Sequence, residues 1–234
     1  MVVADVPVSV VRKNIRNVHL RVYPPEGAVR ISTPARMETE AIRLFALDKL
    51  GWIRRQQEKI REQERETPRE YVERESHYVW GRRYSLRLVE GGQKQGVELL
   101  VRDLVLYVRP GSDRARREAV VEAWYRSLIR DESPPVIAKW EARLGVESSR
   151  LFVRRMKTRW GSCNYRRGYI RLNTELARKP RRCLDYVILH ELVHLLEPSH
   201  NRRFVSLMER HMSTWRECRD ELNRLPVRHD DWPD

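Results

Sequence analysis

Residues 190–194, HELVH, place two histidines four positions apart, with a glutamate directly after the first. In an α-helix, residues four apart lie one above the other on the same face, so His190 and His194 can reach one ion. Glu191 lies about 100° further round the helix, which makes it an awkward ligand but leaves it within reach of a metal-bound water. This H-E-x-x-H spacing is typical of metal-dependent hydrolysis with the glutamate as general base.

The residues around these polar groups predict a buried helix from about residue 181 to 197. Burying two imidazoles and a carboxylate without partners is costly. The alternative is a pair of core histidines satisfied by ordinary hydrogen bonds, and we favour the metal. The apolar positions are Val187, Ile188, Leu189, Leu192, Val193, Leu195 and Leu196.

A catalytic zinc site needs a third protein ligand and a position that stays open for water. Pro198 ends the predicted helix, so the chain can turn and bring His200 back towards the ion. The spacing therefore favours Zn²⁺ bound by His190, His194 and His200. The other candidates for the third ligand are Glu197, Glu209 and Glu217.

The charge balance favours an anionic partner. With 47 Lys and Arg against 33 Asp and Glu, the net charge is +14, which attracts nucleic acid, nucleotide phosphates or acidic protein segments. The three cysteines are widely spaced, so we expect no disulfide framework and a cytoplasmic location. We see neither a secretory signal nor a run of about 20 apolar residues that would span a membrane.

The remaining pattern predicts an α+β fold with a β-rich N-terminal half and a helical C-terminal half. We expect a strand pair over residues 8–33 with a turn at Pro24–Gly27, one long helix over 37–66, and an antiparallel meander over 77–109. A helix capped by Ser112 or Asp113 should follow, interrupted at Pro134–Pro135. The predicted regions are 1–110, β-rich with one long helix, and 111–234, which carries the metal site.

Two strand-like runs, Leu151–Arg159 and Gly168–Leu172, flank a glycine-containing loop and predict a hairpin beside the metal-binding helix. One interpretation makes its outer strand an edge that pairs with an extended substrate, and the other makes it an ordinary structural hairpin. The candidate substrate contacts in this region are Lys157, Arg159, Tyr169 and Arg171.

Three stretches of the C-terminal third resemble a known family when they are taken in order. They are WGSC at 160–163, GYIRLN at 168–173 and DYVILHELVHLLEPSHNRRF at 185–204. This order is similar to the YgjP-like branch of the zincin metal-dependent hydrolases, which are relatives of the SprT-type metallopeptidases. RKNIRNVHLRVYPPEGAVRISTP at 12–34 and LFALDKLGWIRRQQ at 44–57 are also similar, so the resemblance covers nearly the whole chain.

The resemblance implies a zincin-like C-terminal half with a small β-sheet beside the H-E-x-x-H helix. It also implies that His190, His194 and His200 bind zinc and that Glu191 activates water. Val205 departs from the aromatic residue common in the family, and Ser213 stands where members often have proline. Both departures concern packing near the site rather than metal ligation.

Three functions are compatible with these residues. The leading hypothesis is a zinc metallopeptidase, in which Glu191 moves a proton between water and the leaving amine. The second is a metal-dependent nucleotide (pyro)phosphohydrolase, which the basic stretch RRMKTRW favours. The third is a DNA-associated binding protein whose metal is structural. A fourth protein ligand that completes the coordination of the metal would indicate this function.

Overall fold

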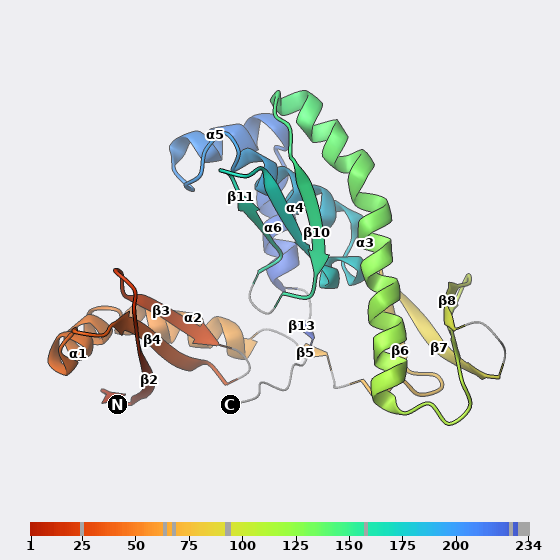
Figure 1. Cartoon of the computed structure of the whole chain (residues 1–234), viewed down its shortest axis with the longest axis horizontal. Helices are drawn as coiled ribbons and strands as arrows, with labels where there is room; N and C mark the ends of the chain where they lie inside the picture. The colour runs from red at the N-terminus through yellow and green to blue at the C-terminus, as the bar shows by residue number, and fades with distance from the viewer. Residues whose placement is uncertain are drawn as a thin grey trace. The chain divides into compact units, whose positions relative to one another are not determined.

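The computed structural model describes residues 1–23, 26–62, 65–66, 69–91, 95–156, 159–224 and 227–228 (Figure 1). The chain forms two compact units, Met1–Pro68 with Arg224–Asp234, and Arg69–Asn223. Strands dominate before residue 110 and helices after it, and a small sheet lies beside the H-E-x-x-H helix. The predicted α+β fold class is therefore confirmed. The division predicted near residue 110 falls inside the second unit, because the strands before it pack against the helix that follows.

The first unit contains a four-stranded sheet and two helices that share one apolar core. The strands, in the order β1-β2-β4-β3, are β1 (Val2–Val3), β2 (Val6–Lys13), β3 (His19–Tyr23) and β4 (Ala28–Pro34). The helices are α1 (Thr39–Asp48) and α2 (Leu50–Glu62). The shared core consists mainly of Val6, Val8, Val29, Ile31, Ile42, Ala46 and Ile53. A short parallel pair, β5 (Arg65–Glu66) with β13 (Val227–Arg228), also belongs to this unit.

Two predictions for this unit are corrected. The run expected as a single first strand forms both β2 and β3, and β2 lies parallel to β4. The helix expected over 37–66 is interrupted at Lys49, which caps α1 with φ −94° and ψ 3°. A break at this point lets Ile42 of α1 and Ile53 of α2 reach the same core. Pro24 and Pro25 of the predicted turn lie outside the described residues.

The second unit begins with a four-stranded sheet in the order β6-β7-β9-β8. Its strands are β6 (Ser76–Val79), β7 (Arg82–Glu90), β8 (Gly96–Leu99) and β9 (Asp103–Val108). The predicted antiparallel meander is wrong, since β7 and β9 are parallel neighbours and β8 lies at the edge. The strand β9 takes the inner position because Leu104, Val105 and Leu106 are all fully buried.

A single helix, α3 (Arg114–Leu144), spans the second unit. Asp113 caps its start by accepting a hydrogen bond from the backbone N–H of Arg116, and Gly145 ends it with φ 67°. The predicted interruption at Pro134–Pro135 does not occur. Buried residues continue at three- and four-residue spacing through the prolines, so tertiary packing holds the helix together despite the lost backbone donors. These residues are Val121, Tyr125, Ile129, Ser133, Ile137 and Trp140.

The helix α4 (Arg181–Val193) packs against α3 and against a three-stranded sheet. Asp185 on α4 fixes the helix pair, because its Oδ1 accepts hydrogen bonds from the Trp140 indole and the Lys139 ammonium, each at 2.8 Å. The sheet is formed by β10 (Arg150–Arg154), β11 (Gly161–Asn164) and β12 (Tyr169–Asn173), and a 3₁₀ helix, η1 (Thr174–Arg178), leads from it to α4. Two further helices, α5 (Arg202–His211) and α6 (Trp215–Arg224), complete the chain's helical part.

The predicted hairpin of residues 151–159 with 168–172 is corrected. The strand β10 runs parallel to β12, and the intervening residues supply the antiparallel partner β11, so the order is β10-β12-β11. Ile170 and Leu172 of β12 are fully buried, which requires β12 to be the central strand. In the described part of the chain, β10 and β11 are thus the two edge strands of this sheet.

Asn173 holds the chain that enters β11. Its side-chain amide donates to the carbonyls of Met156 and Arg159 at 2.8 Å, and its Oδ1 accepts from the backbone N–H groups of Met156 and Glu175 at 3.2 Å. The Asn173 side chain is almost fully buried, and the N–H of Glu175 that it accepts from is buried as well.

Within the described residues, no helix is long and apolar enough to cross a membrane.

Replacing Asn173 with alanine should lower the free energy of unfolding by about 1–3 kcal/mol, because four hydrogen bonds are lost and the buried N–H of Glu175 is left without this partner. Chemical denaturation of the full chain measures this change. The exposed Asn14, substituted by alanine, is the control and should change stability by less than about 0.5 kcal/mol. Equal stability of the two variants would show that the hydrogen bonds of the Asn173 side chain do not stabilise the fold.

Candidate active site

The structure brings the three predicted histidines together. His190 lies in the last turn of α4, His194 is the C-cap residue of that helix, and His200 stands in the following loop. The helix ends at Val193, earlier than the predicted Glu197, so the chain turns before Pro198 rather than at it. This early end gives the loop enough residues to return His200 to the helix face.

One nitrogen from each ring forms a group whose members all lie within 4.8 Å of one another. The Nε2 atoms of His190 and His200 are 3.1 Å apart. Two nitrogens bound to one tetrahedral zinc at about 2.05 Å would be separated by about 3.3 Å, so the observed pair fits a shared cation. In the described part of the chain, no fourth His, Cys, Asp or Glu joins the group.

The protonation of the histidines favours metal binding. Burial, with the two neighbouring imidazoles, lowers the pKa of His190 to about 3. Burial also lowers the pKa of His194, whose Nδ1 lies 3.1 Å from the carbonyl oxygen of Glu197. In the tautomer where Nδ1–H donates to that carbonyl, Nε2 of His194 is left with its lone pair free. Neutral rings of this kind can bind a divalent cation.

Phe204 supports all three rings from α5. Its ring centroid lies 5.0, 4.8 and 4.7 Å from the centroids of His190, His194 and His200. Asn201 begins α5 directly after His200, because its side chain accepts a hydrogen bond from the N–H of Phe204. The cap thus fixes both the end of the histidine loop and the ring beneath it.

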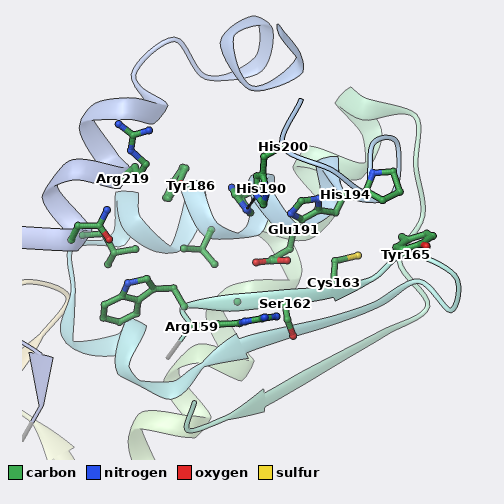
Figure 2. A pocket seen from close by; sticks show the side chains of 16 residues that line it. Arg159, Ser162, Cys163, Tyr165, Tyr186, His190, Glu191, His194, His200 and Arg219 are labelled. Carbon is green, nitrogen blue, oxygen red and sulfur yellow. Dashed lines mark hydrogen bonds between the residues drawn. The ribbon is translucent and has the colours of Figure 1, made fainter. Parts of the chain in front are cut away.

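Glu191 points from α4 towards β11, beside the histidine group (Figure 2). It is 5% exposed, and this burial raises the pKa of its carboxyl to about 8, while the positive charge of Arg159 acts in the opposite direction. The close approach depends on Gly161, since a Cβ there would lie 2.5 Å from Oε1 of Glu191 and 2.9 Å from Cγ1 of Val187. Glycine is therefore required at 161 for α4 and β11 to pack as they do.

A cavity of about 560 Å³ opens beside the histidines and Glu191. Its wall combines Trp160 to Cys163 of the β11 region with side chains of α4 and α6 (Figure 2). Tyr186, one turn before His190 on α4, contributes a hydroxyl whose pKa burial raises to about 12, so it remains a hydrogen-bond donor. Arg159 and Arg219 are also among the residues that line this cavity, and Nε of Arg219 donates a hydrogen bond to Asp220 at 2.8 Å.

The candidate substrate contacts have different positions. Arg159 is among the residues that line the cavity. Tyr169 and Arg171 are not among the residues that line the cavity, and the strand register places their side chains on the face of the sheet opposite that of Gly161 and Cys163. Lys157 lies outside the described residues.

The other candidate metal ligands also lie elsewhere. The Glu197 carboxylate accepts hydrogen bonds from Ser199, and Glu209 forms an ion pair with Arg216. Neither these groups nor Glu217 belongs to the histidine group.

Four residues of the site were not predicted as such from the sequence. They are Gly161, Tyr186, Phe204 and Arg219. Tyr186 was predictable in principle, because it lies four residues before His190 and therefore on the same face of the helix. Gly161 and Arg219 come from β11 and α6, which no local pattern connects to α4.

Three histidines and a buried glutamate at an open cavity are the arrangement of a metal-dependent hydrolase. The family model described as "YgjP-like, metallopeptidase domain" matches residues 16–225, and the chain belongs to this family. No curated protein that was compared matches the chain.

Two solved structures resemble parts of the chain. The metallopeptidase zymogen jannalysin of Methanocaldococcus jannaschii is 23% identical, with 40% of this chain and 92% of that chain covered and a TM-score of 0.34. The metallopeptidase zymogen abylysin of Pyrococcus abyssi is 20% identical, with 42% and 99% covered and a TM-score of 0.36.

Replacing Gly161 with alanine should lower kcat by about 10- to 100-fold, because the new methyl group displaces the Glu191 carboxylate. Bound metal should be retained, since the histidines are not touched. Gly96 is the matched control, because a Cβ there meets nothing within 4 Å. An unchanged kcat in the Gly161→Ala variant would mean that the carboxylate position does not limit turnover.

Proposed function

We propose that this protein is a zinc-dependent peptidase in which His190, His194 and His200 bind the metal and Glu191 is the general base. The observation that carries the proposal is the meeting of three imidazole nitrogens beside a buried carboxylate at the wall of a cavity. Among the described residues the group has three members, which leaves a coordination position for water. A structural metal would instead be expected to have a fourth protein ligand.

Zinc is the preferred ion because three neutral imidazoles suit its borderline-soft character and its tetrahedral geometry. A zinc ion bound there supplies a Lewis acid that lowers the pKa of a water ligand towards about 7 and polarises a carbonyl group. The protein's own contribution is to hold the rings in place, through the Glu197 carbonyl on His194 and through the ring of Phe204.

Glu191 is the residue that transfers a proton from the attacking water to the leaving amine. Arg159 and a divalent cation at the histidines both favour its ionised form, so its carboxylate can accept a proton from the attacking water. The same carboxyl then donates that proton to the leaving amine nitrogen, which completes peptide hydrolysis. Burial between α4 and β11 keeps the carboxylate away from bulk water while this transfer takes place.

A peptide substrate is favoured by the position of β11. Among the described residues this strand is one of the two edge strands of its sheet, and it also forms part of the cavity wall. An extended peptide can pair with the free backbone groups of such an edge, which would place one carbonyl near the histidines. Tyr186 and Arg159 are side chains in the wall that could donate hydrogen bonds to that carbonyl as it becomes negatively charged.

The His200→Ala variant should lose stoichiometric zinc, with an affinity at least 100-fold lower, because one of three protein ligands is removed. Elemental analysis and competition with a chelator measure this change. His211 is the matched control, since its ring packs against Trp140 rather than against the metal group. Full zinc content in the His200→Ala variant would show that a different residue completes the site.

The Glu191→Gln variant should retain zinc and lower kcat by about 10²- to 10⁴-fold, since glutamine has a similar shape but cannot accept the proton. Casein or a fluorogenic peptide library serves as substrate. Glu197→Gln is the control, because that carboxylate is partly exposed, accepts hydrogen bonds from Ser199 and is not among the groups that line the cavity. Retained turnover in Glu191→Gln would exclude this residue as the base.

Nucleotide (pyro)phosphate hydrolysis is the second candidate, and the two arginines in the cavity wall favour it. Guanidinium groups such as those of Arg159 and Arg219 bind phosphate oxygens well. Release of phosphate or pyrophosphate from nucleoside triphosphates, measured beside peptide cleavage with the same zinc-loaded protein, distinguishes the two reactions. Exclusive phosphate release that is lost in Glu191→Gln would replace the peptidase assignment.

A further inference from the structure

The sheet β10–β12 has two faces with different chemistry. One face packs towards α4 and carries Gly161, Cys163, Ile170 and Leu172, of which Ile170 and Leu172 are fully buried. Residues that are paired across neighbouring strands lie on the same face of a sheet, and successive residues along a strand alternate between faces. The strand register therefore defines the opposite face, which we call the outer face.

The outer face consists of two rows that each cross all three strands. The first row is Arg150, Tyr169 and Asn164, and the second is Phe152, Arg171 and Ser162. Each row thus contains one arginine, one aromatic ring and one small polar side chain. Arg150 is exposed and the other five residues are partly exposed, so the rings and guanidinium groups are in reach of a ligand.

The two arginines of the outer face contact an aromatic ring. The guanidinium carbons of Arg150 and Arg171 lie 5.8 and 5.5 Å from the centroid of the Phe152 ring. Tyr169 meets Phe152 edge-to-face at 5.7 Å. Cation–π contacts of this kind hold the guanidinium groups in position without neutralising their charge.

The sequence around the outer face is strongly basic. Residues 150–171 contain eight Arg and Lys and no Asp or Glu. One of these residues, Arg155, forms an ion pair with Glu118 at 3.9 Å. Arginines elsewhere are commonly paired with acids, as in Arg43–Glu40 and Arg178–Glu122. A surface of this kind is complementary to a polyanion.

We propose that the outer face binds single-stranded nucleic acid. Bases would stack on Phe152 and Tyr169, phosphates would pair with Arg150 and Arg171, and the side chains of Ser162 and Asn164 can form hydrogen bonds with base edges. The aromatic rings favour a single strand over a duplex, whose base faces are covered, and over an acidic peptide, which lacks planar bases. The proposal does not depend on the hydrolytic function, because the outer face points away from Glu191.

Fluorescence anisotropy with labelled dT20 and rU20 tests the proposal on the full-length, zinc-loaded chain. Both strands should bind, with affinity that falls between 50 and 200 mM salt by a slope of about −0.7 for each neutralised phosphate. Tighter binding of rU20 than of dT20 would identify RNA as the natural ligand, and the reverse order would identify DNA. Binding of duplex DNA or polyglutamate as tightly as of either single strand would overturn the proposal.

Two substitutions separate stacking from charge. Phe152→Ala should weaken binding about fivefold or more without any change in charge, whereas Phe152→Tyr should bind like the wild type. Arg150→Glu, at an exposed position, should weaken binding and reduce the salt slope by about 0.7 or more. Arg87→Glu makes the same charge change on the β6-β7-β9-β8 sheet and is the matched control.

Circular dichroism and zinc content establish that each variant is folded. If Phe152→Ala does not fold, the comparison of Arg150→Glu with Arg87→Glu decides the question. Equal binding by these two charge variants, or undiminished binding by a folded Phe152→Ala variant, would overturn the outer face as the binding site.

Discussion

The close packing of α4 on β11 is the constraint on which the site depends. A carboxylate is buried at this contact, and it fits because residue 161 has no side chain. The same contact sets the distance between the histidine group and the edge of the sheet. A small shift of the helix would therefore change the base, the metal ligands and the cavity wall together.

The helix α3 gives this contact a rigid support. Its residues Lys139 and Trp140 bind Asp185 on α4, and Arg178, just before α4, reaches Glu122 on α3 at 2.8 Å. Arg178 is almost fully buried and lies over the ring of Tyr125 at 4.5 Å. Such a buried charge is tolerated only when it is paired, so these partners define where η1 enters α4.

The three-stranded sheet separates two kinds of surface over the thickness of one β-layer. Its inner face contributes small and apolar residues to the contact with α4, and its outer face carries arginines and aromatic rings. Because side chains alternate along a strand, adjacent residues such as Arg171 and Leu172 serve different surfaces. A short motif such as WGSC can thus contribute to both, with Cys163 facing α4 and Ser162 on the outer face.

The metal ligands and the base can be predicted as candidates from the residue pattern, because they depend on local geometry. The four-residue spacing of His190 and His194 puts both rings on one helical face, and a proline beyond them suggested the return of His200. The α+β composition was equally readable from the alternation of strand and helix patterns. The helix boundaries are harder to predict from the sequence, since α3 continues through Pro134 and Pro135 where local propensity predicts a break.

Strand order and the faces of the sheets depend instead on contacts between distant segments. Parallel pairing of β10 with β12, and of β7 with β9, joins residues that are far apart in the chain, and no local pattern specifies it. This pairing places Tyr169 and Arg171, which the sequence analysis proposed as substrate contacts, on the outer face of the sheet. Tyr186 and Arg219, which it did not propose, line the cavity. Spacing along one helix fixes which side chains can share an ion, but the pairing of distant segments fixes what surrounds it.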